Sequence, residues 1–261
     1  MRILLTGARG QLGTDIAARL PDRDEVVPVD LPEFDLTDRD TALGVVTQFQ
    51  PDVILHCAAF TAVDLCEEHS ETAWRANALA TRFIADGARR VGAHVVYLST
   101  DYVFDGTKAG PYLEWDRPNP QSVYGRSKLG GELEVDTAWS IVRTSWVCGE
   151  HGNNMVKTLL RLGEGSGPLS FVDDQIGHPT FTSDLAGTGL ALAGAGAGQV
   201  PLHQPGGGQL VRVRPHRVRP GRLRRRADQP DPHRSTRPAS TGDPPGQLGA
   251  GQLRLAPPRV R

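Results

Sequence analysis

The chain has 261 residues, of which 38% are hydrophobic and 23% charged, and its formal net charge is −1. This length suffices for one α/β domain plus a smaller lobe. No apolar stretch reaches the ~18 residues that cross a membrane and no signal peptide fits the N-terminus, so we expect a cytoplasmic protein without a membrane partner. The three cysteines have neither metal-ligand nor redox-motif spacing, so we expect reduced thiols and no metal.

The N-terminal segment predicts a buried strand, a glycine turn and a helix. Residues 2–5 are an apolar run, and Gly7, Gly10 and Gly13 follow it. This spacing allows a tight turn, a close approach of the backbone to a pyrophosphate and close helix–strand packing. The N-terminus of the helix then offers free N–H groups to phosphates. A second apolar run ends in Asp30, at the distance expected of a carboxylate that hydrogen-bonds an adenosine ribose.

Downstream of the turn, helices and strands alternate as in a doubly wound sheet. We predict strands at 52–59 (the fourth), 93–98 and 139–147, and helices at 71–91 and 124–135. Such sheets bind ligands at the carboxyl ends of their strands. Five residues fall at these ends, namely Gly7, Asp30, Ala58, Thr100 and Trp146. The predicted fold is α/β, a Rossmann-like doubly wound parallel sheet with one shared site.

Tyr124 and Lys128 lie four residues apart in a predicted helix, so their side chains share one face. A fixed positive charge favours the phenolate and is expected to lower the tyrosine pKa from its ordinary value of about 10. A tyrosine tuned in this way exchanges a proton with a carbonyl or alcohol oxygen. The pair alone is a common feature of solvated helices, and the preceding nucleotide-binding turn gives it significance.

An ordered set of motifs covers about residues 1–190, at 6–13, 58–64, 99–106, 124–132, 143–146, 152–154 and 174–180. With these motifs the chain resembles the extended short-chain dehydrogenases/reductases and, within them, the dTDP-4-dehydrorhamnose reductase family. The resemblance implies NAD(P)H-dependent reduction of the C4 ketone of dTDP-4-dehydro-L-rhamnose. The product, dTDP-L-rhamnose, serves the biosynthesis of cell-surface polysaccharide.

The resemblance also implies which residues bind the cofactor. Backbone around the glycine turn would hold the pyrophosphate, Asp30 the adenosine ribose, and Asp35 and Leu36 the edge of the adenine. Ala59 and Thr61 would pass along the nicotinamide ribose. The complete implied set is Gly7, Gly10, Gln11, Leu12, Gly13, Asp30, Asp35, Leu36, Ala58, Ala59, Thr61, Tyr124 and Lys128.

Five residues are implied to act on the substrate. Tyr124 would protonate the C4 oxygen as the nicotinamide delivers hydride, and Lys128 would bind the nicotinamide ribose and depress the tyrosine pKa. Thr100 would hydrogen-bond the reacting oxygen or the phenol, with Asp101 nearby on the sugar. Trp146 would pack against the deoxysugar. Core packing is the alternative for Trp146, and a loop or cap role is the alternative for Asp101 and for Thr61.

The identity of the cofactor depends on two side chains. A carboxylate at Asp30 repels a 2′-phosphate and favours NADH. Arg9, in the glycine turn, offers a positive charge to the same phosphate. The resemblance implies tolerance of both cofactors, and we expect NADPH, with NADH also accepted.

Two other function classes compete with the reductase. A sugar-nucleotide 4,6-dehydratase resembles this chain at Thr100-Asp101 but continues with a glutamate that removes the C5 proton. Tyr102 occupies that position here, so elimination lacks its base. A 4-epimerase reuses the Tyr–Lys pair and stays open. A non-catalytic regulatory subunit, like that of methionine adenosyltransferase, shares residues 101–106 but lacks the Thr-Ser-Trp stretch at 144–146.

The C-terminal segment departs from this pattern. We expect a nucleotide-binding domain at 1–150, an incomplete substrate lobe at 151–204 and a disordered tail at 205–261. The tail has thirteen arginines against three aspartates, a charge of +10, so residues 1–204 carry −11. A shift of reading frame near 205–210 explains its Pro, Gly and Arg content, and would leave a product that binds cofactor without turnover. A natural basic tail for nucleic acid or acidic surfaces is the alternative.

The partners implied are correspondingly few. The expected ligand besides the cofactor is a dTDP-4-keto-6-deoxy sugar, and no nucleic acid partner is expected of the reductase. We expect a monomer or a homodimer.

Overall fold

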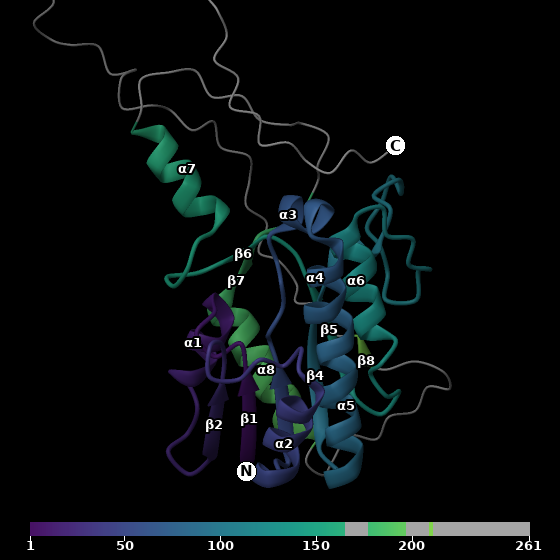
Figure 1. The fold of residues 1–261 in the computed structure, drawn as a ribbon. Helices are drawn as coiled ribbons and strands as arrows, with labels where there is room; N and C mark the ends of the chain where they lie inside the picture. The colour runs from purple at the N-terminus through teal and green to yellow at the C-terminus, as the bar shows by residue number, and fades with distance from the viewer. Residues whose placement is uncertain (165–176, 197–208, 211–261) are drawn as a thin grey trace, which may run out of the picture.

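The computed structural model describes residues 1–164, 177–196 and 209–210 (Figure 1). Most of the predicted tail (205–261) and the first part of the motif at 174–180 lie outside the described residues.

A six-stranded sheet of parallel strands forms the centre of the fold, in the order β2-β1-β3-β4-β5-β8. The strands are β1 (Arg2–Thr6), β2 (Glu25–Val29), β3 (Val53–His56), β4 (His94–Thr100), β5 (Ser140–Thr144) and β8 (Gln209–Leu210). The strand order reverses between β1 and β3. The carboxyl ends of these two strands therefore flank the crevice in which sheets of this kind bind ligands.

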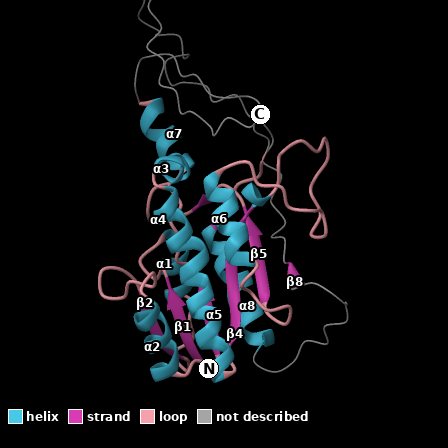
Figure 2. Cartoon of the chain, turned by 45° about the vertical axis from the view of Figure 1, so that its right-hand side comes forward, coloured by secondary structure: helices cyan, strands magenta, loops and turns pink. Residues whose placement is uncertain are grey.

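The helices cover both faces of the sheet (Figure 2). They are α1 (Gln11–Ala17), α2 (Arg39–Phe49), α3 (Val63–Glu68), α4 (Ser70–Trp74), α5 (Ala80–Val91), α6 (Val123–Glu132), α7 (Met155–Gly163) and α8 (Thr182–Gly196). A π-helical turn (Arg75–Leu79) joins α4 to α5, and a 3₁₀ turn (Asp101–Val103) follows β4.

Two hydrophobic clusters lie on opposite faces of the sheet. One joins Leu4 and Ile54 to Val46 of α2 and Ile84 of α5. The other joins Ile3, Leu5, Val53 and Leu55 to Ile16 of α1 and Leu185 of α8. Strands covered by helices on both faces read as continuous apolar runs, which is why residues 2–5 and 53–55 were recognisable as strands. The predicted α/β fold is confirmed.

Several predicted element boundaries are wrong in detail. The strand predicted at 52–59 as the fourth is the third along the chain, and it ends at His56. The helix predicted at 71–91 is interrupted by the π-helical turn, where one extra residue is accommodated. The strand predicted at 139–147 ends at Thr144. Gln209 and Leu210, in the segment predicted to be structureless, pair with Ser140 and Ile141 of β5.

A second, two-stranded sheet explains why the strand at 139–147 divides. Trp146 has a φ of 48°, in the left-handed region that turns the backbone out of β5. β6 (Val147–Cys148) then pairs in parallel with β7 (Thr180–Phe181). From β6 the chain continues to α7, which lies beyond the carboxyl ends of the central strands (Figure 1).

Candidate active site

The glycine turn between β1 and α1 is closely packed. Gly7 has a φ of +67°, and a Cβ there would lie 2.7 Å from the backbone nitrogen of Ala58. A Cβ on Gly13 would lie 2.1 Å from the carbonyl oxygen of Gly7, so this contact requires glycine. Gly10 begins α1 without a side-chain cap. The first N–H groups of α1 are thus not capped by a side chain, an arrangement that suits a pyrophosphate.

Asp30 follows β2 and is held by two backbone donors. Its Oδ2 accepts from Arg9 N at 2.8 Å and its Oδ1 from Leu31 N at 2.8 Å. The Arg9 guanidinium donates to the two carboxylate oxygens of Glu33 at 2.8 and 2.9 Å and to Leu31 O at 2.5 Å. The positive charge that the sequence offers to a 2′-phosphate is therefore paired with Glu33 in this structure.

Asp35 and Leu36 have structural contacts of their own. Asp35 Oδ1 accepts from the backbone N–H and the hydroxyl of Thr37, at 2.9 and 2.7 Å. Leu36 is buried in the same hydrophobic cluster as Val29. Because these side chains already have partners, an adenine would contact the backbone at residues 35–36. Their role beside an adenine stays a prediction.

Asn77, which the sequence did not single out, fixes the loop after β3. It lies fully buried in the π-helical turn. Its Oδ1 accepts from Phe60 N at 2.8 Å, and its Nδ2 donates to Phe60 O at 3.1 Å and to Ser127 Oγ of α6 at 2.9 Å. One amide thus ties the loop that carries Ala59 and Thr61 to the helix that carries Tyr124. A polar residue within an otherwise apolar helical face was the available signal.

A buried polar chain continues from Asn77 toward the glycine turn. Its carbonyl oxygen accepts from Thr81 Oγ1 at 2.7 Å, and Thr81 Oγ1 lies 3.1 Å from His56 Nε2. His56 Nδ1 lies 2.7 Å from Thr6 Oγ1, which accepts from Ala58 N at 3.2 Å. Full burial lowers the pKa of His56 to about 3, so the imidazole is neutral.

Tyr124 lies in the first turn of α6, which Ser122 caps by accepting from Gly125 N at 3.0 Å. The side chain is 9% exposed and its ring meets that of Tyr102 edge-on, with centroids 5.6 Å apart. Its phenol is hydrogen-bonded to the side chain of Thr100, at the carboxyl end of β4. Thr100 Oγ1 in turn lies 3.2 Å from Asp101 Oδ1.

Lys128 does not lower the pKa of Tyr124 in this structure, so that prediction is wrong. Burial dominates and raises the pKa of the phenol above its ordinary value. Lys128 Nζ donates to Leu98 O at 2.7 Å and lies 4.2 Å from the centroid of the Tyr97 ring. Burial also lowers the pKa of this ammonium to about 7. Helical spacing placed the two residues on one face but did not determine what each contacts.

Trp146 is 41% exposed, so the alternative of core packing is wrong. Its backbone oxygen accepts from Thr180 N at 3.3 Å, and a Cβ on Gly177 would lie 2.6 Å from its Nε1. Ser145 Oγ donates to His178 O at 2.8 Å. The 177–180 segment therefore holds Trp146 in place. The indole stays partly exposed, so a sugar can pack against it.

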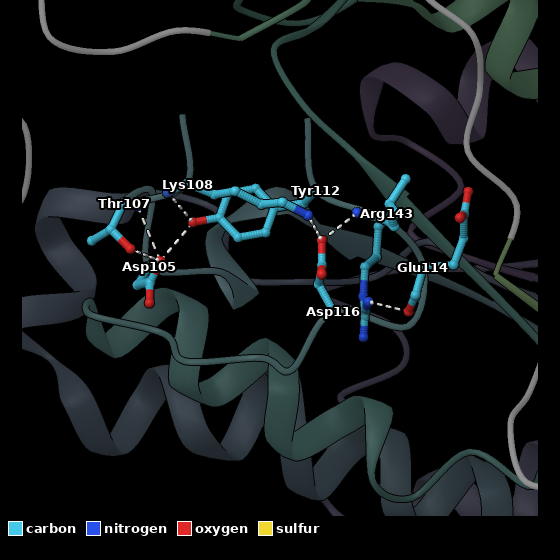
Figure 3. Close-up of polar contacts among 8 residues, drawn as sticks. Asp105, Thr107, Lys108, Tyr112, Glu114, Asp116 and Arg143 are labelled. Carbon is cyan, nitrogen blue, oxygen red and sulfur yellow. Dashed lines mark hydrogen bonds and ion pairs between the residues drawn. The ribbon is translucent and has the colours of Figure 1, made fainter. Parts of the chain in front are cut away.

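The loop between the 3₁₀ turn and α6 is braced by its own polar contacts (Figure 3). Asp105 Oδ1 accepts from the Tyr112 hydroxyl at 2.5 Å and from the backbone N–H and hydroxyl of Thr107. Lys108 pairs with Asp116 at 2.5 Å. The bonds to Asp105 hold the pKa of its carboxyl well below the usual range. Part of the motif at 99–106 is therefore structural.

Arg143 anchors the same loop to α6. It donates to both carboxylate oxygens of Glu132, at 2.8 and 2.5 Å, and to Glu114 O at 3.5 Å (Figure 3 shows the latter contact). Its guanidinium lies 5.0 Å from the centroid of the Phe104 ring. The arginine of the motif at 143–146 thus orients α6 rather than binding at the strand ends.

Gln11 links the glycine turn to the segment before α7. Its Nε2 donates to Asn153 O at 3.0 Å, and its Oε1 accepts from Asn154 Nδ2 at 3.0 Å. Asn154 also caps α7 by accepting from Lys157 N at 3.0 Å. The predicted Gln11 and the motif at 152–154 are therefore in direct contact, which their separation in sequence does not reveal.

The structure brings most of the predicted residues to one end of the sheet. The glycine turn, Asp30, Ala58 and Ala59 lie after β1, β2 and β3, and Thr100, Asp101, Tyr124 and Lys128 lie around the end of β4. Thr61 is exposed on the loop after β3. Within the described residues, no cluster of three or more His, Cys, Asp or Glu side chains suits a metal. No helix in the described ranges is long and apolar enough to cross a membrane.

Comparison with known proteins assigns the chain to one family. A family model described as the RmlD substrate binding domain matches residues 1–210. The dTDP-4-dehydrorhamnose reductase of Aggregatibacter actinomycetemcomitans is 43% identical over 197 residues, 74% of this chain and 67% of that protein. That of Mycobacterium tuberculosis H37Rv is 39% identical over 220 residues, 81% of this chain and 72% of that one. The chain thus spans about two thirds of the length of such relatives.

Solved structures agree. A dTDP-4-dehydrorhamnose reductase of Clostridium acetobutylicum matches with a TM-score of 0.74 at 40% identity, covering 82% of this chain and 74% of that one. The Bacillus anthracis enzyme, in complex with NADP, matches with a TM-score of 0.73 at 38% identity, covering 81% and 73%. The UDP-glucose 4-epimerase of Thermus thermophilus, at 22% identity and a TM-score of 0.61, covers 74% of each chain and shares the fold.

Proposed function

Because the chain belongs to the RmlD substrate-binding-domain family of dTDP-4-dehydrorhamnose reductases, we propose that it reduces dTDP-4-dehydro-L-rhamnose to dTDP-L-rhamnose with NADPH. The observation that carries the proposal is the buried Tyr124 phenol, hydrogen-bonded to Thr100 at the carboxyl end of β4. It lies at the same end of the sheet as the glycine turn, where the parallel strands have their carboxyl ends. We place the reaction in the cytoplasm.

The chemistry requires one hydride and one proton at the C4 carbon and its oxygen. NADPH, when bound, supplies the hydride. Tyr124 supplies the proton to the C4 oxygen, and its raised pKa keeps the phenol protonated until negative charge develops on that oxygen. Thr100 orients the phenol, and the exposed Trp146 offers a face to the deoxysugar.

Lys128 has a different environment from Tyr124. Buried between Leu98 O and the Tyr97 ring, its ammonium is held in place by a hydrogen bond and a cation–π contact. We propose that it hydrogen-bonds the nicotinamide ribose from there. A pKa near 7 lets it gain or lose a proton in the working range.

The residues of the glycine turn fit a dinucleotide. Because Gly7 and Gly13 have no side chains, the backbone of the turn packs closely and leaves room for a pyrophosphate beside it. The first turn of α1 has no side-chain cap. Two backbone N–H donors fix the Asp30 carboxylate, and we propose that it accepts a hydrogen bond from a ribose hydroxyl. For NADPH, Arg9 would exchange Glu33 for the 2′-phosphate, so both cofactors are expected to bind, and comparing kcat/KM for NADPH and NADH measures the preference.

Reduction fits these residues better than the alternatives. The dehydratase reaction needs a carboxylate at position 102, and the Tyr102 ring packs there against Tyr124. Epimerases share the fold at 19–22% identity, which supports no assignment of activity. Three relatives that match at 41–43% identity are named dTDP-4-dehydrorhamnose reductases.

The composition of residues 211–261 supports the proposed change of reading frame. The family match ends at residue 210, and the arginine-rich segment follows directly. We propose that the break lies near 205–210. Translation of the gene in its other two frames tests this: a frame that continues the family pattern supports the shift, and two frames without amphipathic helices contradict it.

Measuring NADPH oxidation with the dTDP-4-keto-6-deoxy sugar tests the function. Wild type is expected to oxidise NADPH, and Tyr124→Phe to lose about 10³-fold in kcat because the proton donor is gone. Binding of NADPH, followed by fluorescence, should survive in the variant. A folded sample that binds NADPH but does not reduce the sugar contradicts the proposed function for this chain.

A further inference from the structure

Asp101 is a half-buried carboxyl connected to the proposed proton donor by one hydroxyl. It begins the 3₁₀ turn that follows β4. Thr100 Oγ1 lies 3.2 Å from Asp101 Oδ1, and the same hydroxyl is the hydrogen-bond partner of the Tyr124 phenol. Tyr102 N donates to Thr100 Oγ1 at 3.2 Å and fixes the hydroxyl between the two groups.

We propose that Asp101 is a catalytic residue that returns a proton to Tyr124 through the Thr100 hydroxyl after each reduction. The proposal rests on the reductase function above. It assigns Asp101 a chemical role beyond contact with the sugar.

The step balances within the three side chains. The carboxyl O–H bond of Asp101 breaks as its proton passes to Thr100 Oγ1, and the proton of Thr100 passes to the Tyr124 phenolate. The products are a neutral phenol, an unchanged threonine and an Asp101 carboxylate. A proton from hydronium or buffer acid in the solvent then returns to the carboxylate, which is half-buried.

The environment gives the transfer its direction. Burial raises the pKa of Asp101 to about 6 and that of Tyr124 above its ordinary value, so a proton moves downhill from carboxyl to phenolate. The groups that act on this pair are Tyr102, Cys66 and, through Tyr102, Asp64. From α6, Lys128 is bound to Leu98 O, and among the contacts of the described residues no hydrogen bond joins its Nζ to Tyr124.

Titration of the protein alone tests the connection without turnover. With ¹³C-labelled aspartate and tyrosine, one carboxyl resonance should titrate near pH 6 and disappear in Asp101→Asn. The Tyr124 ring-carbon resonance, assigned with Tyr124→Phe, should shift at the same midpoint. In Thr100→Val this shared midpoint should be lost from the tyrosine. The proposal is overturned, whatever the activity, if the Asp101 carboxyl titrates near pH 4. It is also overturned if the Tyr124 resonance does not shift when Asp101 titrates.

Kinetics then separate proton return from substrate binding. The side-chain amide of the Asp101→Asn variant keeps an oxygen for Thr100 but holds no transferable proton. We expect kcat to fall at least tenfold with KM within about twofold, and the decline of wild-type kcat above about pH 6 to disappear. Asp64→Asn, an exposed carboxylate nearby, is the matched control and should keep the wild-type profile. A raised KM with unchanged kcat, or an unchanged pH profile, contradicts the relay.

Discussion

The wall around Tyr124, formed by β3, β4, the π-helical turn and α6, and the segment around α7 are built in opposite ways. In the wall, the side chains of Asn77, His56 and Ser127 are buried and each has hydrogen-bond partners. In α7, no residue is buried, and Val156 and Leu160 are exposed although the helix is amphipathic. Gln11 and Lys157 supply polar contacts to the backbone just before this helix.

The difference shows which part of the site is self-supporting. The proton-donor wall is stabilised by contacts within β3, β4, the π-helical turn and α6. The apolar face of α7 has no comparable partner among the described residues. The following changes sharpen or break this contrast.

The largest effect is expected from Asn77→Ala. The change leaves Phe60 N, Phe60 O and Ser127 Oγ without their buried partner, at an expected cost of about 3 kcal/mol in the free energy of unfolding. Urea denaturation measures it. Asn153→Ala, in the α7 segment, is the control and should cost less than about 0.5 kcal/mol. Equal losses in the two variants would abolish the contrast.

Acid is expected to weaken the wall through His56. The pKa of the imidazole is about 3 in the folded protein, against an ordinary value of 6.5. Between about pH 3 and pH 6.5, the unfolded chain therefore binds a proton at His56 that the folded protein does not bind. Stability is therefore full above pH 6.5 and declines below it, by about 2 kcal/mol at pH 5. His94, whose pKa burial also lowers, adds in the same direction. His56→Gln should remove the His56 share, and an unchanged pH dependence in that variant contradicts the assignment.

A smaller effect is expected where the two regions meet. Gln11→Ala removes two hydrogen bonds to the segment before α7, a loss of about 1 kcal/mol. Hydrogen exchange should rise at residues 152–160 and stay unchanged in α6. Gln48→Ala, an exposed position on α2, serves as the control. Unchanged exchange at 152–160 would show that Gln11 does not hold this segment.

The smallest effect is expected on α7 itself. Leu160 is 64% exposed, so Leu160→Ala should change the free energy of unfolding by less than about 0.5 kcal/mol. The same substitution at the fully buried Leu55 should cost about 3 kcal/mol. A cost above about 1 kcal/mol at Leu160 would mean that its apolar face is covered in solution.

The residues predicted for the site differ in how far the sequence could define them. Gly7, Gly13 and Asp30 were predictable because a strand–turn–helix is local and its glycines report backbone contacts directly. The i and i+4 positions of Tyr124 and Lys128 were predictable for the same reason. The direction of the tyrosine pKa was not, because burial by Tyr102 and neighbouring elements outweighs any charge on its own helix.

Long-range partners could not be read from the chain. Asn77 bonds to Ser127 across 50 residues, and Asn154 to Gln11 across 143. Both depend on the packing of elements whose spacing in sequence carries no signal. Likewise, the motif at 143–146 gave no sign that Arg143 forms an ion pair with Glu132 of α6.

By itself, the sequence determined the fold class, the glycine turn and the placement of Tyr124, the proposed proton donor, on one helix face with Lys128, because strand burial, turns and helical spacing are local properties. The tertiary structure decided that Tyr124 is a phenol with a raised pKa, that Asp101 is linked to it through Thr100, and that no residue of α7 is buried among the described residues. These properties depend on desolvation and on contacts between distant segments, which form only when the elements pack.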